Sequence, residues 1–257
     1  MKKRYIYLYL IGWWLFCVAC TGNFRDYNTD LSGITNEDLN IDDNGYGIRL
    51  GIIQQGIYFN YDYGKGKNWP FQLIQNLNAD MFSGYMHDAK PLNGGSNNSD
   101  YNMQDGWNSA MWTHVYSYIF PQIYQSENAT RDTHPALFGI TKILKVEVMH
   151  RVTDYYGPII YRHFANAEKH YQPDTQKEVY YEFFNDLDSA VVALIGYIEE
   201  KPESNGFARF DILLDGKYSS WVKFANSLRL RLAMRLASIA PDKARLEIEK
   251  IKENDYG

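Results

Sequence analysis

The sequence predicts a mainly all-α fold with long irregular loops. In the second half of the chain, apolar residues recur at every third or fourth position over long stretches, which is the period of an amphipathic helix. The first half is interrupted by segments rich in Gly, Asn and Ser. Helices with one apolar face must stack on one another to bury it, so the pattern favours a helical, repeat-like scaffold.

The first residues have the pattern of a secretory signal. Lys2–Arg4 are basic, and Tyr5–Ala19 form an apolar run shorter than the roughly 20 residues of a membrane-spanning helix. We therefore expect residues 1–19 to be a signal peptide. Cys17 to Cys20 resembles the lipobox of bacterial lipoproteins, in which the last cysteine is acylated and becomes the N-terminus. The alternative is that both cysteines are ordinary residues of an apolar helix.

Residues 20–44 are polar and lack a helical or alternating period, so we interpret them as a lipidated tether and a first loop. No cysteine follows Cys20. The processed chain would therefore have no internal disulfide and would depend on its core for stability. Two or more acyl chains on Cys20 would anchor it stably to a membrane.

The composition argues against a nucleic-acid partner and is consistent with a ligand that stacks on aromatic rings. The formal net charge is −5, whereas a nucleic-acid-binding protein needs a basic patch. Aromatic residues make up 16% of the chain, including 22 tyrosines and 6 tryptophans. Tyrosine and tryptophan are amphipathic and serve recognition surfaces as well as cores. The composition is therefore consistent with a surface on which a ligand stacks.

Two short amphipathic helices are expected in the first half of the chain, over residues 49–61 and 71–82. An irregular stretch with Gly94 and Gly95 follows the second of them. Long stretches without regular structure inside a domain tend to be functional or disordered. We therefore expect a functional loop between residues 84 and 112.

Three longer helices are expected in the second half. The first lies between His134 and Pro158, and the second opens at Thr175, which forms a capping-box pattern with Glu178. The third carries an apolar face that runs along residues 221–239. Together these helices would form the stacked scaffold.

Two motifs of catalytic type are incomplete. Glu147 and His150 have the Glu-x-x-His spacing of di-iron bundles, but a second copy is missing, so we interpret them as a solvated acid and a helix-terminal histidine favoured by the helix dipole. Ser220 and Lys223 match Ser-x-x-Lys of penicillin-recognising enzymes, but neither Ser-Asp-Asn nor Lys-Thr-Gly occurs. We expect Ser219 or Ser220 to cap the third helix instead.

Two metal-like patterns are also incomplete. Residues 76–80 alternate as in the start of a calcium loop, but Met81 occupies the position of the sharp-turn glycine. His163 and His170 lack acidic or cysteine partners for a ligand set. The sequence predicts no metal, no cofactor and no catalytic residue, which indicates a protein that is not an enzyme.

Three segments, in this order and after a lipobox, resemble the SusD/RagB family of outer-membrane nutrient-binding lipoproteins. They are "KILKVEVMHRVTDYYGPIIY" at 142–161, "YYEFFNDLDSAVVAL" at 180–194 and "YSSWVKFANSLRLRLAMRLA" at 218–237. The first resembles the family's helix that ends in an aromatic pair, a glycine and a proline. The third matches the family's Trp-x-Lys-x-x-Asn-x-Leu-x-Leu-x-x-Ala-x-Arg helix at Trp221, Lys223, Asn226, Leu228, Leu230, Ala233 and Arg235.

The resemblance implies tetratricopeptide-like helix pairs with an irregular ligand-binding half. It also implies a lid-like position over a SusC-like TonB-dependent transporter in the outer membrane of a Bacteroidetes-type bacterium, anchored by lipid and exposed at the cell surface, where the protein captures oligosaccharides or, in some members, peptides. Family members are typically much longer. We therefore expect residues 45–257 to be a SusD-like helical domain truncated at its C-terminus, with exposed apolar faces where the missing part would pack.

The candidate ligand-binding residues lie in and near the expected loop. Sugars present apolar C–H faces that stack on aromatic rings and hydroxyl groups that need polar partners. Side chains of both kinds are provided by Trp69, Tyr85, Tyr101, Asn102, Gln104, Asp105, Trp107 and Asn108. By contrast, we interpret the side chains of the third helix as scaffold, with its arginines paired to acids on neighbouring helices.

Three functions remain open from the sequence. The first is a lipoprotein that captures oligosaccharides and passes them to the transporter. The second has the same fold but binds peptides. The third is a structural scaffold that associates with the transporter but has no competent ligand site.

Overall fold

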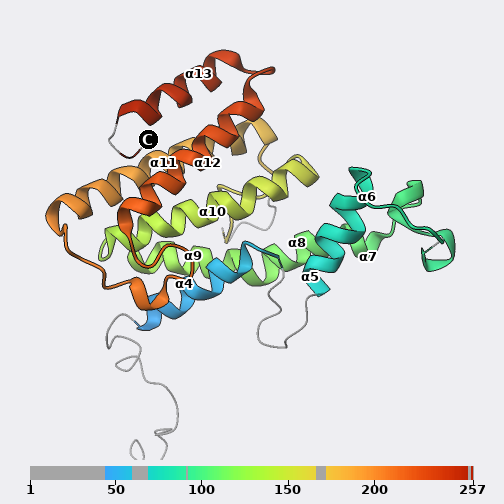
Figure 1. Cartoon of the computed structure of the whole chain (residues 1–257), viewed down its shortest axis with the longest axis horizontal. Coiled ribbons are helices and arrows are strands. Elements are labelled where there is room, and N and C mark those ends of the chain that lie inside the picture. The colour runs from blue at the N-terminus through green and yellow to red at the C-terminus, as the bar shows by residue number, and fades with distance from the viewer. Residues whose placement is uncertain (1–43, 60–68, 91, 166–171, 254–255, 257) are drawn as a thin grey trace, which may run out of the picture. The chain divides into compact units, whose positions relative to one another are not determined.

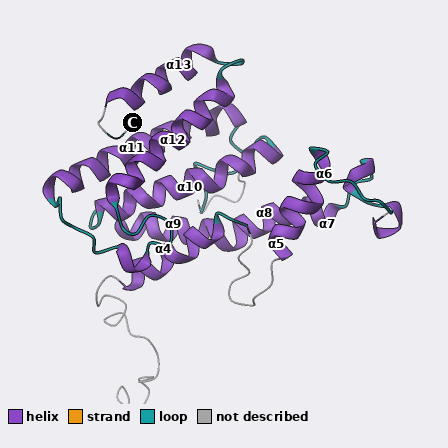
Figure 2. Cartoon of the chain, in the orientation of Figure 1, coloured by secondary structure: helices purple, strands orange, loops and turns teal. Residues whose placement is uncertain are grey.

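The computed structural model describes residues 44–59, 69–90, 92–165, 172–253 and 256. The expected signal peptide, Cys20, the expected tether up to residue 43 and His170 lie outside these residues. In the described part the regular elements are helices, and the only β-type pairing is one isolated bridge between Ile159 and Asp174 (Figure 2). The predicted mainly α-helical fold is confirmed. Among the described helices, none is long and apolar enough to cross a membrane.

Five helices form a stack in the second half of the chain, in which each helix packs against the next (Figure 1). They are α9 (Phe120–Thr130), α10 (Pro135–Tyr156), α11 (Gln176–Glu200), α12 (Tyr218–Leu236) and α13 (Pro241–Lys250). The stack has the helix-on-helix arrangement that the amphipathic periods predict.

The contact between α10 and α11 is close because α10 presents a glycine to its neighbour. A Cβ atom added to Gly139 would lie 3.0 Å from the carbonyl oxygen of Ala190 and 3.2 Å from the side chain of Leu194. The predicted capping box at the start of α11 is confirmed, since the Thr175 hydroxyl accepts from the Glu178 N–H and the Glu178 carboxylate accepts from the Thr175 N–H. The glycine that allows close packing and the capping box that begins α11 are therefore both local sequence features that suit this pair of helices.

Helix α12 confirms one expectation and corrects another. Trp221 is fully buried, as expected, and its indole Nε1 donates to Asp211 Oδ2 at 2.8 Å. The helix begins at Tyr218 without a side-chain cap, and in the preceding turn the Asp211 carboxylate accepts the backbone N–H groups of Leu213, Leu214 and Gly216. Ser219 and Ser220 therefore lie inside the first turn and do not cap it.

Some apolar side chains of the last helices face solvent. Ile239, expected on the apolar face of α12, lies in the turn beyond it and is 78% exposed. Leu230 and Met234 on α12 and Leu246 on α13 are exposed as well. Exposed apolar residues thus occur on these helices, whereas the expected truncation stays a prediction.

Ion pairs connect neighbouring helices of the stack. The buried carboxylate of Asp186 on α11 pairs with Lys142 and Lys145 of α10, at 2.5 and 3.3 Å. The two lysine ammonium groups also lie near Glu127 of α9. Burial alone would raise the pKa of Asp186. The positive charges of Lys145 and Lys142 outweigh this effect and hold the pKa below its ordinary value.

The arginines of α12 pair with acids on neighbouring helices, as the sequence predicts. Arg229 bonds Asp188 of α11 and Glu247 of α13. Arg231 pairs with Glu147 of α10, and Arg235 pairs with Asp154 of the same helix. These residues therefore belong to the scaffold interfaces.

Two interpretations of α10 were wrong. Glu147 is not a solvated acid, because it lies partly buried against Arg231, and burial raises the pKa of its carboxyl group. His150 is not at a helix end but is buried two turns before it, where its Nδ1 contacts the Val146 carbonyl at 3.2 Å. Burial, and then the charge of Arg231, lowers the pKa of His150 to about 4.

The first half of the described chain contains shorter helices. Helix α4 (Asn44–Gly56) contacts the turn before α12, where Gln54 donates to Phe210 O and accepts from Ile212 N–H, both at 3.0 Å. The elements that follow are α5 (Trp69–Phe71), the π-helical η2 (Gln72–Ala79), α6 (Asp80–Phe82), the 3₁₀ turns η3 (Leu92–Gly95) and η4 (Asn98–Asp100), α7 (Asp105–Asn108), α8 (Ala110–His114) and the π-helical η5 (Val115–Ile119).

Candidate functional site

The functional loop expected between residues 84 and 112 is shorter than predicted, because α7 and α8 occupy its last part. The loop runs from Ser83, after α6, to Gln104, before α7, and is called the 83–104 loop below. Its turns need left-handed backbone conformations. Gly94 and Gly95 adopt φ values of 65° and 86°, which glycine tolerates without steric cost. Its polar and aromatic side chains divide into an inner and an outer set.

The outer set consists of large side chains directed to solvent. Tyr85 is 88% exposed and Tyr101 is 72% exposed, and Met86 and Met103 are exposed beside them in the sequence. Tyr101 has a φ of 57°, a left-handed conformation that costs an L-residue roughly 1–2 kcal/mol. Its ring lies 6.1 Å from that of Phe82. The loop therefore holds an exposed aromatic side chain in a strained conformation, which points to a use outside the core.

The inner set includes Asn98, which bonds Asn78 of η2 and Asn108 of α7, and these three residues are called the amide cluster below. Asn98 is 1% exposed, and its Nδ2 donates to Asn78 Oδ1 and Leu77 O at 2.7 Å and to Asn108 Oδ1 at 3.0 Å. Asn78 Nδ2 donates in turn to the carbonyls of Leu73 and Trp107, at 2.7 and 2.8 Å. The amide cluster thus joins η2, the loop and α7 through neutral groups.

The last turn of α10 holds the amide cluster from the other side. The Tyr155 hydroxyl donates to Asn78 Oδ1 at 2.7 Å. The Tyr156 hydroxyl donates to the Asn108 carbonyl and accepts from the Trp112 N–H at 3.1 Å. Burial raises the pKa of Tyr155 to about 12, so its phenol stays a donor at neutral pH. The aromatic pair before Gly157 therefore fixes the base of the loop to the helix stack.

Asp88 organises the middle of the loop. Its carboxylate accepts from the Ser99 hydroxyl at 2.6 Å, the Leu92 N–H at 3.0 Å and the Asn97 amide at 3.2 Å. The Ser99 hydroxyl, followed by the Leu92 N–H, lowers the pKa of Asp88. Asn97 is fully buried and its Oδ1 accepts from the Ser99 N–H. These bonds close the loop on itself.

The structure places the candidate ligand residues in different settings. Tyr85, Tyr101 and Asn102 lie on the exposed side of the loop, and the Asn102 amide donates to Gly95 O at 3.1 Å. Trp107 is half-buried on α7. Trp69 lies on α5, partly exposed, with its ring edge-on to His114 at 6.2 Å. The candidate residues therefore do not all lie on one exposed face.

Three candidates are engaged within the protein. Asn108 Oδ1 accepts from Asn98 and from the Tyr155 hydroxyl, so its side chain holds the loop in place. The Gln104 amide donates to the Ser96 hydroxyl. Asp105 opens α7, and its backbone carbonyl accepts from the Ser109 N–H at 2.8 Å.

Sequence reasoning missed the residues that position the loop, which are Asn78, Asn98, Asp88, Tyr155 and Tyr156. The aromatic pair was visible as a family motif, but its role depends on partners far away in the sequence. In a segment where apolar residues do not recur at a regular spacing, the sequence does not distinguish buried asparagines from solvated ones. The cluster therefore became apparent only from the fold.

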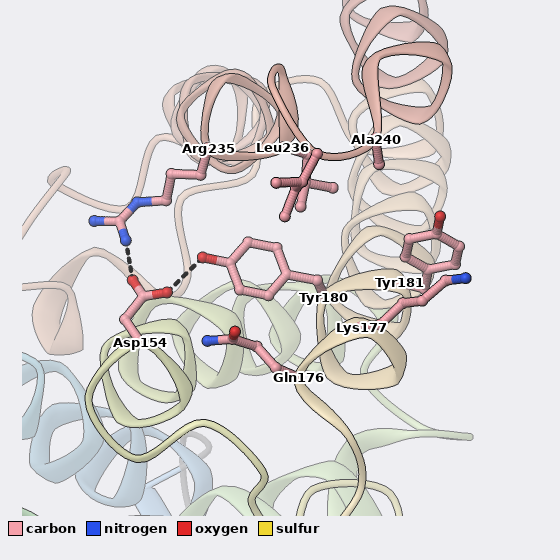
Figure 3. Close-up of a pocket in the computed structure, with 9 residues that line it drawn as sticks. Asp154, Gln176, Lys177, Tyr180, Tyr181, Arg235, Leu236 and Ala240 are labelled. Atoms are coloured by element: carbon pink, nitrogen blue, oxygen red, sulfur yellow. Dashed lines mark hydrogen bonds and ion pairs between the residues drawn. The ribbon is translucent and has the colours of Figure 1, made fainter.

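A cavity of about 560 Å³ lies where the ends of α10, α11 and α12 meet the turn to α13 (Figure 3). Asp154 accepts from the Tyr180 hydroxyl at 2.5 Å and from Arg235, as the dashed lines in Figure 3 mark. The cavity is lined by Asp154, Gln176, Lys177, Tyr180, Tyr181, Arg235, Leu236, Ile239 and Ala240. Among the described residues, no group of three or more His, Cys, Asp or Glu side chains is arranged to hold a metal ion.

A family model described as SusD and RagB outer-membrane lipoproteins matches residues 26–257. Solved structures similar to the chain include a SusD homologue from Bacteroides vulgatus, with 45% identity and a TM-score of 0.78, and a chitin-binding SusD homologue from Flavobacterium johnsoniae, with 38% identity and a TM-score of 0.73. The matches cover 84% and 80% of this chain but only 44% and 43% of those chains. The chain thus spans less than half the length of these relatives.

A SusD-like protein from Bacteroides thetaiotaomicron is similar over 80% of the chain, with 25% identity and a TM-score of 0.68. None of the curated proteins compared with the chain matches it. The resemblance inferred from the three helical segments is confirmed by the family model and by these structures.

Proposed function

The chain belongs to the family of SusD and RagB outer-membrane lipoproteins, and we propose that it captures oligosaccharides at the cell surface and delivers them to a SusC-like TonB-dependent transporter. The observation that carries this proposal is the division of the 83–104 loop. The buried Asn98 amide of the loop bonds Asn78 of η2 and Asn108 of α7, whereas Tyr85 and Tyr101 face solvent. A rigid loop that exposes aromatic rings suits the stacking of sugar faces.

The proposed attachment to the membrane is supported by the sequence. Residues 1–19 act as the signal peptide, Cys20 carries the acyl chains, and residues 20–44 form the tether. The tether lets the helical domain lie against the transporter. Residues 1–43 fall outside the described part of the chain, so the anchor rests on the lipobox pattern and on the family.

The candidate residues take different parts in binding. Tyr101 and Tyr85 stack on the ligand. Asn102, next to Tyr101 in the sequence, forms hydrogen bonds with the hydroxyl groups of the ligand. Trp69 and Trp107, which flank the loop in the sequence, extend the surface where they are accessible. Asn108 acts through the amide cluster, because its Oδ1 accepts from Asn98 and Tyr155. Binding without turnover is proposed, since no residue of the site has been assigned to catalysis.

The choice of ligand is supported by one relative. The Flavobacterium johnsoniae homologue is a chitin-binding protein and is 38% identical to this chain. Chitin and its oligosaccharides therefore come first in the panel of ligands to test. Peptides remain the second candidate, because the family resemblance includes them.

The proposal is tested with the full chain in detergent, run through affinity gels that contain chitin or other polysaccharides. We expect at least one glycan to retard the protein, and Tyr101→Ala to lose that retardation. Tyr58→Ala, at another exposed tyrosine outside the loop, is the matched control. Displacement by peptides but not by oligosaccharides would assign the site to peptides, and co-purification with the transporter without any ligand would favour a scaffold.

A further inference from the structure

A second and smaller cavity, of about 270 Å³, lies between α9, α10 and α11 and has no part in the proposed glycan site. Its lining residues come from one side of α9 and its C-cap, from α10, from residues 161–164 and from α11. None of them belongs to the 83–104 loop or to the cavity of Figure 3. This cavity combines aromatic rings, balanced charges and polar side chains with spare bonding capacity.

Helix α9 and its C-cap place an aromatic ring, an amide and a guanidinium on one side. Tyr124, Asn128 and Arg131 follow one another at spacings of four and three residues, which brings side chains to the same side of a helix. The Arg131 guanidinium lies 5.8 Å from the centroid of the Phe138 ring. Among the hydrogen bonds and ion pairs of the described residues, none uses this guanidinium or the Asn128 amide. Donors and an acceptor are therefore available to a ligand in this cavity.

Two aromatic rings form an apolar corner of the cavity. Tyr124 is 38% exposed, and its ring centroid lies 5.9 Å from that of the half-buried Phe164, with the two ring planes at 74°. The Phe164 ring packs in turn on the buried ring of Phe120 at 4.4 Å, which holds it in place. Rings that stand at a steep angle to each other and are partly accessible suit a ligand with adjacent apolar surfaces.

The largely buried charges of the cavity are balanced. The ammonium groups of Lys142 and Lys145 lie between 2.5 and 3.7 Å from the carboxylates of Glu127 and Asp186. Two positive and two negative charges in one network fix one another in position. They leave no net charge for an ionic ligand to neutralise.

The more exposed charges of the cavity are balanced as well. Arg162 pairs with Asp174 at 2.7 Å and with Glu178 at 3.0 Å. Arg131 and Glu182 also line the cavity and carry opposite charges. The cavity therefore favours a neutral ligand over an anion or a cation, and one whose hydroxyl groups both donate and accept.

We propose that this cavity binds one neutral pyranose ring, either a free sugar or the end residue of a glycan. The C–H face of the ring packs in the corner formed by Tyr124 and Phe164, and its hydroxyl groups bond Asn128 and Arg131. A volume of about 270 Å³ lies just below the roughly 300–1,000 Å³ of sites for drug-sized ligands, which suits a single ring rather than a longer chain. The inference goes beyond the proposed function, because the cavity would bind a sugar even if the 83–104 loop bound a peptide.

The test uses the full chain in a detergent without a sugar head group, and saturation-transfer NMR. The neutral probes are the methyl pyranosides of glucose, galactose, mannose and N-acetylglucosamine, and the charged probe is methyl glucuronide. We expect at least one neutral probe to bind saturably, and the glucuronide to bind more weakly than the best of them. Absence of saturable binding by all four neutral probes, or tightest binding by the glucuronide, would overturn the proposal.

Variants on α9 locate the sugar in this cavity. Tyr124→Ala removes one side of the apolar corner and should weaken the best probe at least about tenfold, which corresponds to about 1.4 kcal/mol. Asn128→Ala should weaken it several-fold, whereas Gln125→Ala, at an exposed position of the same helix outside the cavity, should not. All three positions are exposed, so urea unfolding should change little. Equal binding by Tyr124→Ala and the unchanged chain would overturn the proposal.

The 83–104 loop provides the comparison that separates the two sites. Tyr101→Ala should bind the best probe like the unchanged chain, and Tyr124→Ala should keep its retardation in the polysaccharide gel. Loss of probe binding in Tyr101→Ala would place the sugar in the loop and overturn the proposal. Normal gel retardation without any binding of the neutral probes would overturn this inference alone and leave the proposed function standing.

Discussion

The helix stack and the 83–104 loop both bury polar groups, but they satisfy them in opposite ways. In the stack, the buried carboxylate of Asp186 is paired with the charged groups of Lys142 and Lys145. In the loop region, Asn98 bonds other neutral amides and backbone carbonyls. A buried charge that loses its partner costs far more than a buried amide. The stability of the fold should therefore depend on the stack, and the shape of the binding surface on the loop.

The largest effect is expected at the buried charges of the stack. Asp186→Ala leaves Lys142, Lys145 and the Tyr161 hydroxyl without their common partner, and should lower the free energy of unfolding by about 3–5 kcal/mol. Urea unfolding followed by circular dichroism measures this change. Asp188→Ala is the control, because Asp188 is 41% exposed and Arg229 keeps Glu247, so its effect should be within about 1 kcal/mol. Equal effects of the two changes would contradict this contrast.

The next effect is a dependence on pH that belongs to the stack. The folded-state pKa of His150 is about 4, lowered mainly by burial, so the unfolded chain takes up its proton near pH 6.5 before the folded chain does. Stability is therefore lost as the pH falls from 6.5 to about 4, by an amount on the order of 3 kcal/mol for this group.

His114 also has a pKa of about 4, lowered by burial, so the effect of His150 must be isolated by difference. Unfolding of the unchanged chain and of His150→Gln across this pH range gives that difference. The variant should lose less stability on acidification. Parallel curves for the two proteins would show that His150 is already protonated in the fold.

A smaller and local effect is expected at the amide cluster. Asn98→Ala leaves Asn78, Asn108 and the Leu77 carbonyl without their shared donor, at a cost of about 1–3 kcal/mol. Hydrogen exchange should become faster in residues 72–112 while α10 and α11 keep their protection. Asn102→Ala, which removes one exposed bond to Gly95, is the matched control. Faster exchange throughout α11 would show that loop and stack are one cooperative unit.

The smallest effect concerns the link between the two regions. Tyr155→Phe keeps the ring and removes the hydroxyl that donates to Asn78, so it should lower stability by about 1 kcal/mol. Affinity for the glycan should also fall, because the base of the loop loosens. The same urea and affinity-gel measurements apply. A Tyr155→Phe variant that is less stable but binds normally would show that this hydroxyl stabilises the base of the loop without affecting the ligand site.

The helices of the stack were predictable because each carries a long periodic pattern with local signals. The capping box of Thr175 and the buried face of α12 followed from neighbouring residues alone. The pairing of Arg229, Arg231 and Arg235 with acids was also expected, although the partners were not named. Such features depend on spacing within one helix, which the sequence displays directly.

The site was less predictable because its residues are joined across the fold. Tyr85 and Tyr101 were correctly placed in a loop, but nothing in the sequence separates their exposed rings from the buried amides of Asn97 and Asn98. The environment of His150 depends on α12, which lies far along the chain. The cavity at Asp154 depends on four separate elements that meet only after folding.

The central claim is that the exposed rings of the 83–104 loop bind glycan while buried amides hold the loop in shape. The most direct test compares retardation of the unchanged chain, Tyr101→Ala and Asn98→Ala in a glycan affinity gel, together with their urea unfolding. We expect Tyr101→Ala to lose retardation with a stability change within about 0.5 kcal/mol, and Asn98→Ala to lose part of it. Retardation of Tyr101→Ala equal to that of the unchanged chain would contradict the account.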